Sequence, residues 1–175
     1  HQWEGTVKFI FQPSEEGLGG AESMIAEDVL SNPAPDACFG IHLWNEKPLG
    51  WVAVTPGPFM AASEIFTIQL TGRGGHGALP NTTIDPLLAA AHIITALQSI
   101  VSRNVSPLQT AVVSVTLVRA GDAFNIIPHT AELRGTIRTF EPDVREKVIA
   151  RFEEIVNGIA SAMGCEVSIQ MQSLT

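Results

Sequence analysis

The sequence predicts an α/β protein in two parts, a strand–helix–strand segment followed by a βαββαβ module. Apolar runs typical of buried strands alternate with stretches of helical periodicity along the chain. With 175 residues, 45% of them hydrophobic and 16% charged, the chain has enough apolar side chains for a core. Prolines and glycines gather in residues 45–62, so a domain boundary is expected near residues 58–62. We therefore expect one domain over residues 1–60 and another over residues 61–175.

Two buried strands and one helix are expected in the first part. Residues 6–12 and 37–44 are apolar runs that suit strands, and residues 20–30 repeat apolar side chains at helical spacing. Residues 31–36 contain two prolines and end that helix. A strand, a helix and a strand within about 40 residues imply a parallel pair, so both strands should end at one edge of a sheet.

The second part carries four strand patterns. Residues 63–71 alternate, so that Phe66, Ile68 and Leu70 share one face of the strand. Three further runs rich in β-branched or alternating residues also predict strands. They are residues 110–118, 131–138 and 165–171.

Two helices are expected between these strands. Asp85 and Pro86 suit the N-cap and first position of a helix to about residue 103, and Glu141-Pro142 opens a longer one to about Met163. The first helix should face the core with Leu87, Leu88, Ala91, Ile94, Leu97 and Val101. The order βαββαβ over residues 63–172 predicts a ferredoxin-like domain, one antiparallel sheet with two helices on one face.

Composition excludes several classes of protein. The net charge of −8 argues against a nucleic-acid binder, and no apolar run approaches the roughly 20 residues of a membrane helix. Cys38 and Cys165 are too few for a disulfide framework and lie in apolar runs, so both are expected to be buried. The first residues show no basic segment followed by an apolar core, so a cytoplasmic location is expected.

Polar side chains follow the first two strands. Glu15 and Glu16 come directly after residues 6–12, and His42 lies near the end of the second run. If the strands are parallel neighbours, these groups meet at one sheet edge, where carboxylate and imidazole suit zinc, manganese, cobalt or nickel. The alternatives are a solvated acidic turn for the two glutamates and a core position for His42. Glycines flank His76 closely, which is typical of a functional loop.

Five motifs resemble the M20 family of metallopeptidases, and within it the amidohydrolases that cleave N-acyl amino acids, hippurate-type substrates and auxin–amino acid conjugates. They occur in the family's order and span nearly the whole chain. They are residues 11–16 (FQPSEE), 39–42 (FGIH), 72–80 (GRGGHGALP), 125–128 (NIIP) and 137–140 (IRTF).

The resemblance implies a role for each site residue. Glu15 is similar to the general base, and Glu16 and His42 to metal ligands of a site for two divalent ions. His76 is similar to the lid histidine that stabilises the oxyanion, often in the partner subunit's site. Asn125 and Arg138 are similar to groups that hold the substrate's carboxylate. For Asn125 a turn-capping role, and for Arg138 a surface charge at a strand end, are the alternatives.

The resemblance also implies a domain organisation. Residues 1–60 would belong to a catalytic domain, and residues 61–175 would form the lid and dimerisation domain of a homodimer. The family's other metal ligands, a His-x-Asp segment and a Cys- or His-Gly-His-Asp segment, would precede residue 1, and one more histidine would follow residue 175. We therefore expect metal-dependent amide hydrolysis of N-acyl amino acids or related peptides from the longer enzyme. The 175 residues alone are expected to be inactive and to bind no metal, and a non-catalytic dimerisation module is the alternative reading.

Overall fold

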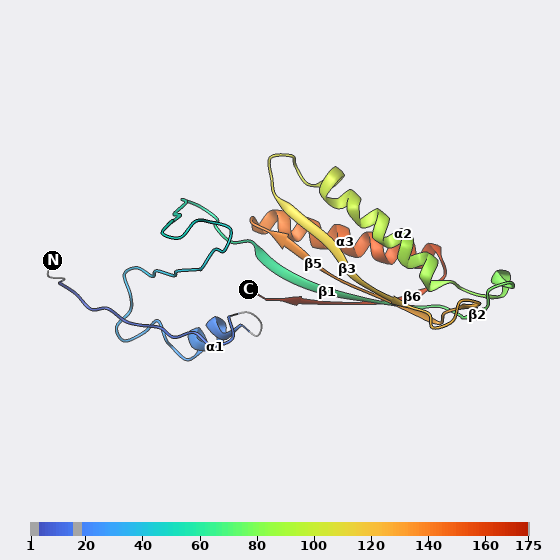
Figure 1. The fold of residues 1–175 in the computed structure, drawn as a ribbon, viewed down its shortest axis with the longest axis horizontal. Coiled ribbons are helices and arrows are strands. Elements are labelled where there is room, and N and C mark those ends of the chain that lie inside the picture. The colour runs from blue at the N-terminus through green and yellow to red at the C-terminus, as the bar shows by residue number, and fades with distance from the viewer. Residues whose placement is uncertain (1–3, 16–18, 175) are drawn as a thin grey trace. The chain divides into compact units, whose positions relative to one another are not determined.

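A computed structural model of the chain describes residues 4–15 and 19–174 (Figure 1). The chain divides into two compact units, His1–Gly57 and Pro58–Thr175.

The first unit contains one helix, α1 (Gly20–Ala26), and no strand among its described residues. The predicted strands over residues 6–12 and 37–44 therefore do not form, and neither does the parallel pair or its shared edge. A strand needs neighbours to accept and donate its ladder hydrogen bonds, and these two segments have none within residues 4–15 and 19–57. Their apolar side chains face solvent instead: Phe9 is 79% exposed and Ile41 is 98% exposed.

The second unit is built on a four-stranded antiparallel sheet. Its strands are β1 (Ala62–Thr71), β3 (Ala111–Ala120), β5 (Thr130–Thr139) and β6 (Glu166–Ser173), in the order β3-β5-β1-β6 (Figure 1). Two long helices lie between strands in the sequence, so the predicted βαββαβ order is confirmed. Both strands in the middle of the sheet, β1 and β5, alternate buried and more exposed residues, which is the pattern of a sheet covered on one face.

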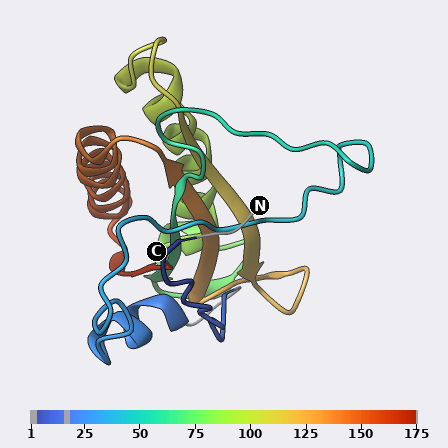
Figure 2. The same cartoon turned by 90° about the vertical axis from the view of Figure 1, so that its left-hand side faces the viewer.

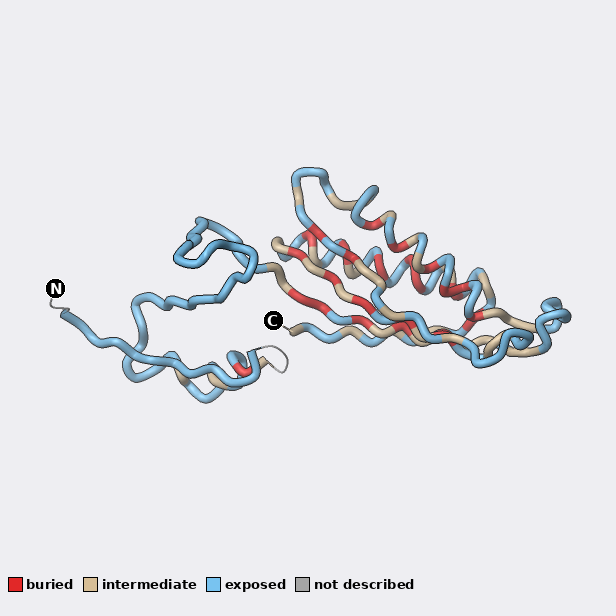
Figure 3. Tube along the Cα trace, in the orientation of Figure 1, coloured by how far each residue is buried: buried red, intermediate tan, exposed pale blue. Residues whose placement is uncertain are grey.

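Helices α2 (Pro86–Ser99) and α3 (Pro142–Ala162) cover one face of this sheet (Figures 1 and 2). Asp85 caps α2 as predicted, because its carboxylate accepts hydrogen bonds from the backbone N–H groups of Leu87 and Leu88 at 2.9 and 3.1 Å. A π-helical turn, η2 (Ile100–Asn104), continues α2. In this unit the buried positions fall on the strands and on the two helices (Figure 3), and the rings of Phe66 and Phe152 in the core have centroids 4.7 Å apart.

The predicted core stripe of α2 is largely wrong. The side buried against the sheet and α3 is offset from that stripe and consists of Pro86, Ala89, Ala90, Ile93, Leu97 and Ile100. Leu87, Leu88 and Val101, which were expected in the core, are exposed. The error has a physical cause: α2 is apolar on both sides, so periodicity alone does not decide which side is buried.

A second, two-stranded ribbon extends from the sheet. It pairs β2 (Gly75–His76) with β4 (Ile126–Ile127) in antiparallel register, and a short 3-10 turn, η1 (Pro80–Thr82), follows β2. The ribbon connects to the sheet at the end where Thr71 of β1 pairs with Thr130 of β5. The opposite end of β1 adjoins the boundary with the first unit.

The two cysteines differ in environment. Cys165 is buried, as predicted, whereas Cys38 is exposed because the strand expected to bury it does not form. In the described part of the chain no helix is long and apolar enough to cross a membrane.

Candidate functional site

His76 lies on the β2–β4 ribbon, opposite Ile126. Glycines allow the two segments to approach closely. A Cβ on Gly74 would lie 2.7 Å from the carbonyl oxygen of Ile127, and one on Gly75 would lie 2.8 Å from Cγ2 of Thr83. These glycines therefore serve to bring the backbone of the His76 loop against its neighbours.

The loop also selects one tautomer of the neutral His76 ring. The backbone N–H of Ala78 donates a hydrogen bond to Nδ1 of His76 at 3.1 Å. Since a nitrogen that accepts this bond carries no proton, the proton of the neutral ring is at Nε2. The exposed side chain thus presents an N–H donor to whatever lies beyond the tip of the ribbon.

Asn125 immediately precedes β4 and is next to His76 in space. The backbone N–H of Gly77 donates to the backbone carbonyl of Asn125 at 2.8 Å, which ties the two loops together. The Asn125 side chain is exposed, and among the described residues it makes no hydrogen bond to the turn. His76 and Asn125 therefore share the tip of the ribbon and supply a donor and an amide there.

Arg138 lies at the opposite end of the same unit. It pairs with Ser63 at the start of β1, and its Nη1 donates a hydrogen bond to Oγ of Ser63. It lies eight positions along β5 from Thr130, the first residue of β5 after the ribbon, which at strand rise is about 26 Å. The structure thus places Asn125 with His76 and separates Arg138 from both within one copy of the module.

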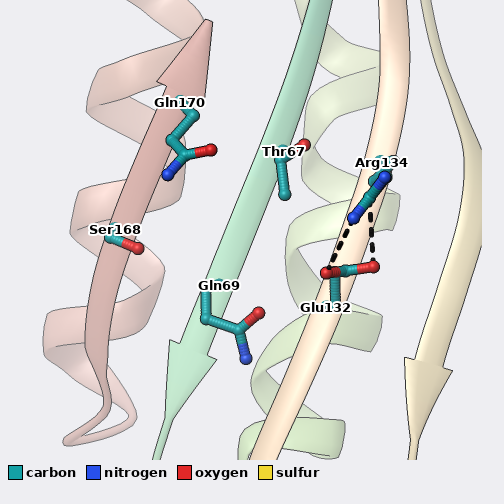
Figure 4. Close-up of a pocket in the computed structure, with 6 residues that line it drawn as sticks. All are labelled: Thr67, Gln69, Glu132, Arg134, Ser168 and Gln170. Atoms are coloured by element: carbon teal, nitrogen blue, oxygen red, sulfur yellow. Dashed lines mark hydrogen bonds and ion pairs between the residues drawn. The ribbon is translucent and has the colours of Figure 1, made fainter.

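The face of the sheet without helices is polar. A hollow of about 350 Å³ lies on it, lined by Thr67, Gln69, Glu132, Arg134, Ser168 and Gln170 (Figure 4). Arg134 and Glu132 pair through two hydrogen bonds of 3.1 and 3.2 Å. This ion pair lies at the surface and is partly exposed to solvent, so it contributes little to stability. Arg138 lies on the same face, because it is an even number of residues from Glu132 and Arg134.

The predicted metal site falls on the first unit. Glu16 lies outside the described residues, and Glu15 and His42 are exposed. Nδ1 of His42 is 2.6 Å from the carbonyl oxygen of Leu43, which can only accept, so Nδ1 carries the proton and Nε2 keeps a lone pair for a metal. Carboxylate and imidazole are ligand types that suit a divalent ion. Their number is too small for a metal site, because no three His, Cys, Asp or Glu side chains come together among the described residues.

Sequence reasoning missed two residues near Arg138. They are Glu64 of β1 and Arg145 of α3. Glu64 is only 1% exposed. Its Oε1 accepts a hydrogen bond from Nε of Arg145 at 2.6 Å and lies 2.6 Å from Nη2 of the same side chain. The sequence could have revealed this pair. Glu64 is an even number of residues from Phe66 and Ile68 and so lies on the core face of β1. A buried carboxylate needs a cation nearby, which a covering helix can supply.

The fold alone, an antiparallel sheet with two helices on one face, occurs in proteins of many functions. Residues 64–163, from β1 to the end of α3, match the peptidase dimerisation domain of the M20 family. The chain therefore belongs to the M20 peptidase family.

Curated relatives and solved structures agree with this assignment. The chain is 44% identical to an N-acetylcysteine deacetylase of Bacillus subtilis over 95% of this chain and 43% of the relative. It is 41% identical to the Arabidopsis thaliana IAA-amino acid hydrolase ILR1-like 4, over 95% of this chain and 37% of the relative. The chain thus spans less than half the length of these relatives.

Among solved structures, a dinuclear metal-binding M20 peptidase of Bacillus subtilis has a TM-score of 0.70 and 34% identity, over 93% of this chain and 39% of that one. The aminobenzoyl-glutamate utilization protein of Klebsiella pneumoniae has a TM-score of 0.72 and 28% identity, over 94% of this chain and 41% of that one. The relatives that are named for a reaction act on amide bonds, and one neighbour binds two metals.

Proposed function

We propose that the whole protein hydrolyses the amide bond of N-acyl amino acids in a metal-dependent reaction, as a homodimer assembled through the module of β1 to β6. The observation that carries this proposal is the ribbon tip, where His76 presents an Nε2–H donor beside Asn125. A donor held in place by its own loop suits a developing oxyanion, because no reorganisation is needed when the charge forms. The names of the relatives support acyl amino acids as the substrate class.

The length of β5 supports a site shared between two subunits. One small acyl amino acid cannot reach both Arg138 and the His76 tip of the same module, which are about 26 Å or more apart. A guanidinium matches a carboxylate with two hydrogen bonds, and we assign Arg138 to the substrate carboxylate in its own subunit. His76 and Asn125 then serve the site of the partner subunit.

One side of the module is suited to a second copy. Between Asp85 and Arg103 the sequence has no Asp, Glu, Lys or Arg, and Leu87, Leu88 and Val101 of this stretch are exposed. The neighbouring edge strand β3 also exposes Val118, which lies on the helix-covered face of the sheet. The other helix, α3, carries many charged side chains on its solvent side and needs no cover. We assign the α2–β3 side, defined by these exposed residues of α2 and β3, to the dimer interface.

The residues of the first unit complete the proposal. Glu16 and His42 are assigned as metal ligands and Glu15 as the base that moves the proton of the attacking water to the leaving amine. The metals, when bound by the whole protein, supply the polarised water. Because the described residues assemble no three-ligand group, we propose that the 175 residues alone act as a dimerisation module without hydrolytic activity.

Subunit complementation in the whole protein tests this function. Glu15→Gln and His76→Ala homodimers are each expected to lose about 10²-fold or more of kcat. After mixing and exchange, roughly a quarter of wild-type activity should return, since half of the dimers are mixed and each has one intact site. No recovery despite demonstrated exchange would mean that His76 acts within its own subunit. No turnover of any acyl amino acid by the wild type would refute the function itself.

A further inference from the structure

Arg138, which is proposed above to bind the substrate carboxylate, has a hydrogen-bond partner in β1. Nη1 of Arg138 donates a hydrogen bond to the hydroxyl of Ser63, its direct partner across the β1–β5 pair. Both side chains lie on the face without helices. A guanidinium on a flexible stem loses rotamer entropy when it binds a ligand, and a fixed acceptor beside it removes part of that cost in advance.

Ser63 is itself held on several sides. Its backbone carbonyl accepts from the N–H of Leu174 at 2.9 Å, which attaches the last residues of the chain to the start of β1. The next carbonyl along, that of Glu64, accepts from Oγ1 of Thr136 at 3.0 Å. The first residues of β1 are therefore fixed although they lie only a few residues from the boundary between the two units.

An ion pair between buried Glu64 and partly exposed Arg145 fixes the same part of β1 from the helix side. Glu64 is paired to Arg145 in the first turn of α3, with Nε and Nη2 of Arg145 both 2.6 Å from the same carboxylate oxygen. Burying such a pair gains little net stability over apolar residues of similar size. Its geometric effect is definite, because it sets the position of α3 against the strand position that immediately follows Ser63.

We propose that Ser63 is a positioning residue for Arg138, and that the Glu64–Arg145 pair holds Ser63 in register for this task. This role rests on the proposed function: Ser63 orients the guanidinium of Arg138 toward the carboxylate of the acyl amino acid. Ser63 acts through Arg138 and contacts no reacting atom.

Steady-state kinetics of the whole protein test this role with two matched substrates, an N-acetyl amino acid and its carboxamide. Ser63→Ala should raise KM for the carboxylate about 10-fold, the effect of one hydrogen bond to a charged group, and leave kcat and the KM of the carboxamide within about twofold. Ser63→Thr, which keeps the hydroxyl, should restore KM. Glu64→Gln, with folding checked by thermal unfolding, should raise KM for the carboxylate in the same direction.

Arg138→Ala distinguishes a failure of the Ser63 positioning role from a failure of the carboxylate-binding role of Arg138. If Arg138→Ala removes the preference for carboxylate over carboxamide and Ser63→Ala does not change it, the positioning role is wrong and the proposed function stands. If Ser63→Ala raises KM equally for both substrates, the positioning role is also wrong, because the effect does not pass through carboxylate binding. If Arg138→Ala leaves the preference intact, the assignment of Arg138 fails and the role of Ser63 fails with it.

Discussion

The ring of Phe66 occupies the space above Gly135, its partner across the β1–β5 pair. A Cβ on Gly135 would collide with Cζ of Phe66 and with the backbone carbonyl oxygen of Ser114. Phe66 is fully buried and packs against Phe152, so it has no room to move away. Gly135 is therefore required by packing in the middle of the sheet.

Gly135→Ala should lower the free energy of unfolding by about 2 kcal/mol or more, because both clashing groups belong to the core or the backbone. Denaturant titration of the second unit measures this change. Gly158→Ala is the matched control: Gly158 is exposed in α3 with nothing near its missing Cβ, so alanine should stabilise the helix by about 0.5–1 kcal/mol. Equal effects at the two sites would contradict the packing argument.

A charge on the exposed side of α2 should abolish self-association. Leu88 is 50% exposed on the α2–β3 side, and Leu88→Lys would bury a charge in the proposed interface. Light scattering should give twice 18.7 kDa for the wild type and 18.7 kDa for the variant. Glu146→Lys, on the exposed side of α3, introduces the same side chain and should leave the dimer intact. A monomeric wild type at high concentration would contradict the interface.

Limited proteolysis should separate the two units. Cleavage is expected within residues 4–57, where the described backbone has one short helix and no strand pairing, while a fragment beginning near Pro58 survives. Mass spectrometry of the resistant fragment locates its start. Resistance of the first unit as strong as that of the sheet would show that its apolar segments are protected in solution.

Cys165 provides a chemical measure of unfolding in the second unit. Burial, and secondarily the Asp85 carboxylate, raise the pKa of the Cys165 thiol above its ordinary value of 9.0. The folded state thus favours the neutral thiol, so this contribution to stability is complete below pH 9.0 and is lost as the pH rises past the unfolded-state value. Alkylation at pH 8 should label exposed Cys38 rapidly and Cys165 only after denaturant is added. Equal rates would show that the unit opens readily.

The sequence predicts the second unit well because its signals are local. Asp85-Pro86, Glu141-Pro142 and the left-handed Gly164 mark helix ends by their own chemistry, whatever surrounds them. In strand β1 the alternation of apolar and polar side chains indicates which face is buried.

The structural predictions that are wrong concern features that depend on contacts with segments distant in sequence. Residues 6–12 and 37–44 have the composition of buried strands, but a strand forms only beside another. Likewise, periodicity could not identify the buried side of α2, because both sides are apolar. The spacing of Arg138 from His76 depends on the length and register of β5 and was also not readable from the motifs.

The span of β5 has a kinetic consequence for the proposed enzyme. Because each catalytic centre would draw its anchor and its oxyanion donor from different molecules, a lone subunit would be inert even with every metal in place. Turnover per molecule would then decline on dilution below the dissociation constant of the pair. Cellular abundance itself would set the specific rate, without any effector or modification.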